Sequence, residues 1–360
     1  MKLILNTRVM KRYFLAVTFL LFSISGFAQK KKKQDTALPP PVPKAMEAPE
    51  FEIRETGNNQ EDEEYPPVLT IMGSLETINI IKTNGEEIRL NTFKDLKKIN
   101  LSELKSLSLE ANYSRTKTKL EGRFLQEILE KGLQLESLEI RHFEIESFPE
   151  IKKPNNVLKK LELKKNELKT LPPSISNLVA LEDFASYYNP LQELPETFSQ
   201  LKNLKKLSLG NAEFSAFPKV VFGLNNLSVL HISGNYKGES KIKEIPDLFA
   251  QLPEIEEFKV THSLISTLPK SISTLTKLKR VDFSYNQFND FPEALASNPN
   301  LKFVPFSSNP LDWNKFTASI KKIKWRGLFF LNGTGFSKKQ YEEIQKMLPK
   351  IDVYYDEMSD

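Results

Sequence analysis

The chain has 360 residues, a formal net charge of +5 and no cysteine. Without cysteine it has no disulfide, thiolate metal site, thiol nucleophile or lipid anchor on a cysteine. Residues 1–28 carry four basic side chains and no acidic one. The remainder is therefore close to neutral, which removes the charge argument for nucleic-acid binding.

Residues 1–28 have the pattern of a secretory signal peptide. Lys11 and Arg12 precede an apolar run over 14–27, and Gly26 and Ala28 supply the small residues needed for cleavage. The run is shorter than the roughly 20 residues that span a bilayer. We therefore expect export to the periplasm or the cell surface, with no stable membrane insertion after cleavage. The alternative is an uncleaved anchor, because the Lys30–Lys33 run resists translocation.

Residues 29–66 are predicted to be a disordered linker, because they combine lysine-rich, proline-rich and acidic stretches with few large apolar residues. Residues 67–103 follow with strand-like segments at Val68–Ile71, Ile78–Ile81 and Ile88–Leu90, and with a turn at Gly85. We interpret them as an N-terminal cap, since the end of a repeat array needs covering.

From Leu104 onward the frame Leu-x-x-Leu-x-Leu-x-x-Asn recurs in steps of 23 residues or 23 plus a short insert. Its copies begin at Leu104, Leu135, Leu158, Leu181, Leu204, Leu227, Ile255, Leu278 and Leu301, and more faintly at Trp325 and Leu348. Two longer steps predict surface insertions at about 113–119 and 236–241. The second and third leucines alternate inward along a short strand, so stacked copies should form a parallel sheet.

Two further columns support this reading. Asparagines follow the strand, where their amides can satisfy the backbone of the next coil, at Asn112, Asn166, Asn189, Asn235, Asn286 and Asn309, with breaks at Phe143, Ala212 and Ser263. Prolines then begin tight turns in which apolar residues recur every three positions, as at Pro149, Pro172, Pro195, Pro218, Pro246, Pro269 and Pro292.

The predicted fold class is therefore an α/β solenoid with a parallel concave sheet and short helical or 3-10 turns on the convex side. Repeats should occupy 104–324, and a C-terminal repeat and cap should occupy 325–360. In that cap we expect a helix with Ser337 as its N-cap and an edge strand over 352–355.

These columns resemble the leucine-rich-repeat superfamily, in its 23-residue class with a Leu-Pro step, over about 104–355. The resemblance implies a horseshoe capped at both ends, and the class is common among exported bacterial proteins. The shared columns are structural, so function must be sought in the side chains that the fold does not require.

Adjacent aromatic residues on the concave face are the candidates for binding. Tyr187 and Tyr188 are expected to wall a shallow trough of small residues that continues past His231 and His262 to Tyr285. A second apolar patch is expected at Phe303, Pro305, Phe329 and Leu331. We predict a non-catalytic module that captures a protein or a glycan on this face, and we expect a monomer.

Catalysis and metal binding have little support. His231 and His262 lie three places apart along the strand direction, which is too far for shared zinc ligation. Ser208 neighbours His231, but no oxyanion hole or glycine elbow accompanies them. We expect no cofactor and no enzyme activity. A structural envelope scaffold or spacer is the main alternative, and a hydrolase is the weakest.

The signal pattern makes a prediction about the mature chain. Protein isolated from the native host should begin at Gln29, because signal peptidase would cut after Ala28. Mass spectrometry of the N-terminal peptide measures this directly. An intact Met1 on protein from the cytosolic fraction would contradict it.

Overall fold

The structure, a computed structural model, describes residues 75–111, 118–145, 147–235 and 241–356. The expected signal peptide, the linker, the Val68–Ile71 strand and most of both insertions lie outside these residues. Residues 67–360 form a unit of their own.

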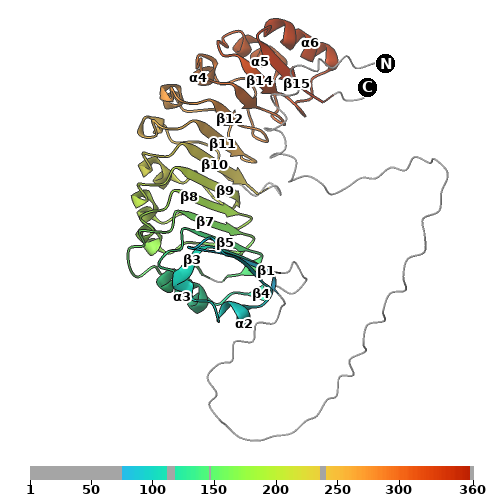
Figure 1. The fold of residues 1–360 in the computed structure, drawn as a ribbon. Helices are drawn as coiled ribbons and strands as arrows, with labels where there is room; N and C mark the ends of the chain where they lie inside the picture. Colours follow the sequence, from blue (N-terminus) through green and yellow to red (C-terminus); the bar gives the residue numbers. More distant parts are fainter. Residues whose placement is uncertain (1–74, 112–117, 146, 236–240, 357–360) are drawn as a thin grey trace, which may run out of the picture. The chain divides into compact units, whose positions relative to one another are not determined.

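One 13-stranded sheet runs through this unit, and from β3 onward its strands are parallel and stack in chain order (Figure 1). Its strands are β1 (Leu75–Lys82), β2 (Glu87–Leu90), β3 (Leu104–Ala111), β5 (Ser137–Arg141), β7 (Lys160–Lys164), β8 (Asp183–Tyr187), β9 (Lys206–Ala212), β10 (Val229–Gly234), β11 (Glu257–Thr261), β12 (Arg280–Asp282), β13 (Phe303–Pro305), β14 (Gly327–Phe330) and β15 (Ile351–Tyr354). Two short strands, β4 (Thr118–Lys119) and β6 (Phe143–Glu144), pair separately.

Short helical turns return most coils on the side opposite the sheet, although the described residues between β5 and β7 form none (Figure 1). The 3-10 turns are η2 (Leu101–Glu103), η3 (Pro173–Asn177), η4 (Glu196–Gln200), η5 (Lys219–Gly223), η6 (Phe249–Gln251) and η7 (Lys270–Thr274); the α-helices are α2 (Phe93–Leu96), α3 (Gly122–Lys131), α4 (Glu293–Ala296), α5 (Trp313–Ile320) and α6 (Lys338–Met347). The predicted fold class is confirmed: the unit is an α/β solenoid with a mostly parallel sheet and short helical turns on the opposite side.

The core lies between the sheet and these turns. The inward leucines of the frame are fully buried, and Leu207 pairs in register with Phe184 of β8 and Leu230 of β10. Phenylalanines fill the wider part of the coils with edge-on ring contacts, such as Phe249 against Phe258 at 4.9 Å. Each coil therefore buries its apolar side chains only by contact with its neighbours.

The predicted asparagine ladder is present at Asn166, Asn189, Asn286 and Asn309, whereas Asn112 lies outside the described residues. Asn189 is 1% exposed; its Nδ2 donates to the Leu163 carbonyl at 3.0 Å and its Oδ1 accepts from the Asn166 backbone N–H at 2.9 Å. Asn286 and Asn309 donate in the same way to carbonyls of the preceding coils. Ala212 and Ser263 occupy the equivalent positions where the ladder was expected to break.

Both ends carry structure that departs from the repeat. The β1–β2 hairpin lies antiparallel to β3, and its turn holds Gly85 at a φ of 87° that glycine adopts without strain. At the other end Ser337 caps α6, and Gln340 completes a capping box, as the sequence predicted for this N-cap.

The tenth repeat does not follow the predicted frame. Phe303 pairs with Leu328, and Val304 pairs with Phe329, one residue later than expected. The cause is Gly327, whose φ is 152° and where a Cβ would lie 2.2 Å from the Lys302 carbonyl oxygen. This extra residue places Phe329 on the inward face and Phe330 on the outward face. The predicted outward position of Phe329 is therefore wrong.

The packing predicts the cost of opening a central coil. Leu207→Ala removes a fully buried side chain and should lower the free energy of unfolding by about 2–5 kcal/mol, as a lost transfer term plus a cavity term. Equilibrium urea denaturation would measure it. Lys206→Ala, an exposed position on the same strand, is the control. An unchanged midpoint for Leu207→Ala would show that the inward column is misassigned.

Candidate functional site

The outward face of the sheet is arranged in columns, because parallel neighbours pair in register from β3 to β12, apart from one shift after Ile232 between β9 and β10. Side chains in one column stand about 4.8 Å apart from coil to coil. The two halves of this face differ: the N-terminal half consists mainly of charged groups, and the C-terminal half adds stacked aromatic rings.

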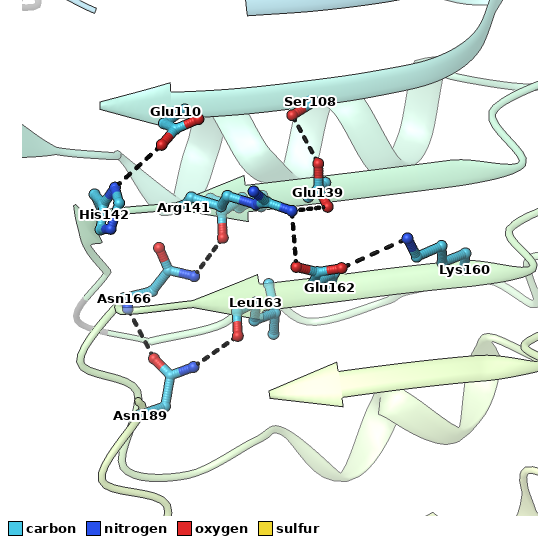
Figure 2. Close-up of polar contacts among 11 residues, drawn as sticks. Ser108, Glu110, Glu139, Arg141, His142, Lys160, Glu162, Leu163, Asn166 and Asn189 are labelled. Carbon is cyan, nitrogen blue, oxygen red and sulfur yellow. Dashed lines mark hydrogen bonds and ion pairs between the residues drawn. The ribbon is translucent and has the colours of Figure 1, made fainter. Parts of the chain in front are cut away.

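In the N-terminal half a network of polar side chains bridges three strands (Figure 2). Arg141 contacts Glu139 of its own strand and donates to Glu162 of the next strand at 3.0 Å. The Ser108 hydroxyl donates to Glu139 at 2.9 Å, and Lys160 lies 3.5 Å from Glu162. Each carboxylate therefore already has partners within the protein.

The pKa values of the two carboxylates of this network are shifted in opposite directions. Although burial raises it, the pKa of Glu139 is held below its usual value by Arg141 and the surrounding hydrogen bonds. Burial and the neighbouring Glu139 charge raise the pKa of Glu162. Like charges on adjacent coils cannot both ionise freely. The network is thus a self-contained charge cluster and offers little to an incoming ligand.

In the C-terminal half, Glu257 is the centre of a second charged cluster. It receives a hydrogen bond from His231 Nε2 at 3.0 Å and lies 2.7 Å from Lys259 Nζ. Arg280 Nε of the next strand lies 3.5 Å from Glu257 Oε2. Burial opposes ionisation, but the His231 and Lys259 hydrogen bonds lower the pKa of Glu257 to about 2.

Tyr187 does not wall an open trough as expected. Its ring lies across Gly210 of the next strand, where a Cβ would be only 2.6 Å from the ring. Burial raises the pKa of the Tyr187 phenol. Because Gly210 has no side chain, the Tyr187 ring packs directly against its backbone. That face of the ring is therefore not available to a ligand.

Tyr188, His262 and Tyr285 share a backbone feature. Each directly follows the outward strand residues and has a positive φ, of 55°, 52° and 57°. Other residues of this kind, which we call the left-handed column, are His142, Lys165, Asn211 and Ser308. Side chains with a Cβ rarely adopt this conformation, and asparagine tolerates it best.

The aromatic members of the left-handed column reach solvent. Tyr188 is 45% exposed and Tyr285 is 52% exposed. Lys165 Nζ lies 5.4 Å from the centroid of the Tyr188 ring, and His262 stacks on Tyr285 with a centroid separation of 4.3 Å. Burial lowers the pKa of His262, which favours the neutral imidazole at neutral pH. These rings are held by neighbours and remain open on one side.

A stack of rings closes the C-terminal end of the face. Phe303 lies under the Arg280 guanidinium at 4.4 Å and contacts Phe330 at 5.0 Å, and Phe330 stacks on Tyr354 at 4.9 Å. Phe329, the expected member, is fully buried against core rings, as is Leu331. The register shift at Gly327 therefore replaces Phe329 by Phe330 on the outward face.

The serine and the histidine that were considered as a catalytic pair lie on adjacent strands. Ser208 pairs with His231 in the sheet as expected, but the described residues contain no hydrogen bond between their side chains, and His231 is engaged with Glu257. Among those residues no group of three histidine, aspartate or glutamate side chains is placed to hold a metal ion. None of the described helices is long and apolar enough to cross a membrane.

Sequence reasoning missed the left-handed column, Phe330 and Tyr354. The first had a signal, because Asn211, Ser308 and Gly333 occupy equivalent places after their strands, and small or amide residues there indicate a positive φ. The outward position of Phe330 depends on a one-residue bulge, for which Gly327 was the only available sign, whereas that of Tyr354 agrees with the frame at Leu348.

The solved structures that resemble this chain are leucine-rich-repeat proteins. A leucine-rich-repeat protein of Leptospira interrogans is 23% identical over 68% of this chain and 71% of its own, with a TM-score of 0.43. An internalin from Listeria monocytogenes is 15% identical over 76% and 86%, with a TM-score of 0.42. No family model matches the sequence, and a search of curated proteins finds no match.

The Glu257 cluster predicts a dependence of stability on pH. Its carboxylate ionises at about pH 2 in the folded chain instead of near 4.5, so its stabilising contribution is present above pH 4.5 and is lost as the pH falls toward 2. One pKa unit corresponds to about 1.4 kcal/mol, which sets an upper bound of about 3 kcal/mol. Glu257→Gln should therefore flatten the unfolding free energy across this window in urea titrations. Parallel profiles for both proteins would contradict the assignment.

Proposed function

We propose that this chain is a non-catalytic binding module that captures a protein partner at the left-handed column between Tyr188 and Tyr285. One observation carries the proposal: two large aromatic side chains are exposed at backbone positions that disfavour them. Exposed tyrosines are enriched among residues that dominate binding energy.

The fold itself gives no reason for these rings. Holding a residue other than glycine at a positive φ costs free energy, and such strain clusters at binding and active sites. Asn211 occupies the same column one coil after Tyr188 and suits the conformation better. Tyr188 is 45% exposed and Tyr285 is 52% exposed, so packing offsets this cost only in part. Binding of a partner supplies the missing reason.

The spacing along the column favours a protein segment. Two coils separate those of Tyr188 and His262, which places the two side chains about 14 Å apart at about 4.8 Å per coil. Asn211 follows Tyr188 in the column, and in the next coil the buried Gly234 pairs with Ala212. An α-helix with its side chains is about 10–12 Å across, so one helix fits between Tyr188 and the His262–Tyr285 pair. A glycan stacked on a single ring is the alternative.

Export is part of the proposal. A Lys/Arg-rich start, an apolar run and small residues before Gln29 support delivery to the periplasm or the cell surface. A structural scaffold or spacer competes with the binding module. It would need a uniformly polar face, whereas the exposed rings here are confined to the middle and C-terminal coils.

The test replaces both tyrosines by asparagine, which suits a positive φ. Tyr188→Asn combined with Tyr285→Asn should abolish capture from an envelope extract of the native host while leaving the melting temperature unchanged or slightly raised. Ser308→Asn, in the same column, is the matched control and should retain capture. Protease treatment of the captured material then separates a protein from a glycan. Full capture by the double variant would refute this site.

A further inference from the structure

Among the described residues, β15 is the last strand of the sheet, and one side of its backbone has no strand beside it. In β15, Asp352 and Tyr354 face β14, as shown by the Leu331 N–H, which donates to the Tyr354 carbonyl at 2.8 Å. The carbonyl of Ile351 and the N–H of Val353 therefore face away from β14. Such an edge is a template for pairing with another strand.

The side-chain amide of Gln345 occupies this edge. Its Nε2 donates to the Ile351 carbonyl at 2.8 Å, and its Oε1 accepts from the Val353 N–H at 3.1 Å. The same Nε2 lies 3.2 Å from the Leu348 carbonyl. Within the repeats the corresponding place is taken by backbone: the Asp183 N–H donates to the Lys159 carbonyl at 2.9 Å. Gln345 thus stands in for one residue of a further parallel strand.

We propose that the outer edge of β15 is a strand-pairing surface for a second copy of this chain, and that the Gln345 amide occludes it. Occlusion keeps the protein monomeric. Displacement or loss of the amide exposes the donor and the acceptor together, which is the pair of groups that another strand requires.

The strand's own sequence favours a second copy as the occupant. In an antiparallel pair centred on Val353, Ile351 faces Tyr355, and Asp352 faces Tyr354. Lys350 faces Asp356 twice, once on each side of the two-fold axis. Opposite charges directly across an antiparallel pair stabilise it. The two-fold contact also closes on itself, so it yields a dimer and no longer assembly.

The aromatic stack reaches the same edge. Phe303, Phe330 and Tyr354 stack in order across β13, β14 and β15, and Tyr354 is 46% exposed at the end of the series. A second copy would bring its own Tyr354 diagonally across the pair, within reach of aromatic contact. The opposite edge of the sheet, β2, offers no such symmetry with β15, and pairing with it would build open chains.

The experiment measures the mass of the full chain by sedimentation velocity over a range of concentrations. We expect the wild type to sediment as one chain and Gln345→Ala to shift to the mass of two. Adding Val353→Pro removes the edge N–H and should return the variant to one chain, because β14 does not use that group. Lys346→Ala, the exposed neighbour of Gln345 in α6, is the matched control and should remain monomeric.

A charge exchange tests the register. In the Gln345→Ala background, Lys350→Glu should weaken the dimer by about tenfold, since two cross-strand pairs are lost, and adding Asp356→Lys should restore it. The proposal is overturned by any of three results: a monomeric Gln345→Ala protein, assembly beyond two chains, or a dimer that is insensitive to Val353→Pro. Loss of folding in Gln345→Ala would also overturn it, because the amide would then be required by the fold itself.

Discussion

A coil of this solenoid cannot satisfy its own backbone, and every strand depends on the next for its hydrogen bonds. The asparagine ladder exists because the chain must turn after each strand, and Asn189 supplies the donor and the acceptor that the turn lacks. The left-handed residues lie at the same turns. At β15, the last of the described strands, the side-chain amide of Gln345 bonds the backbone groups that a further strand would otherwise bond. All of these features lie where the backbone must turn or the described sheet ends, and the asparagine and glutamine amides satisfy backbone hydrogen-bonding groups there.

Most of the fold could be predicted from the sequence because each coil must pack against and hydrogen-bond to its neighbours, and the residues that do so recur every 23 positions apart from short inserts. The inward leucines, the asparagines and their breaks all lie where the frame placed them. The prediction failed at the tenth repeat, since Trp325 still fills the frame position and is buried. The extra residue lies beside it at Gly327, where only a close approach to the Lys302 carbonyl explains the glycine. That contact joins two coils and is invisible in the sequence.

The candidate site was less accessible to sequence reasoning. Tyr188 and Tyr285 stood out because the columns do not require them, and their exposure agrees with that reasoning. Tyr187 looked equivalent, yet its ring is already placed over Gly210. Alternation along the strand separates inward from outward residues, but it does not tell which outward side chains are occupied by neighbours. The same limit applies to the charges, because Glu139 and Glu257 are engaged within the protein.

The breaks at Ala212 and Ser263 bear on how the solenoid opens. Before the breaks, the Asn166 backbone N–H donates to the side chain of Asn189 in the next coil. After them, the Asn309 side chain accepts from the Phe288 N–H and donates to the Phe283 carbonyl, both in the coil of Asn286. Nearest-neighbour coupling sets cooperativity in a repeat array, and buried amide ladders add to that coupling. The coils between 212 and 263 are therefore the weakest links, and hydrogen exchange should divide the chain there into two foldons. The space between Tyr188 and His262 spans this boundary, so a partner bound there would tie the two foldons together.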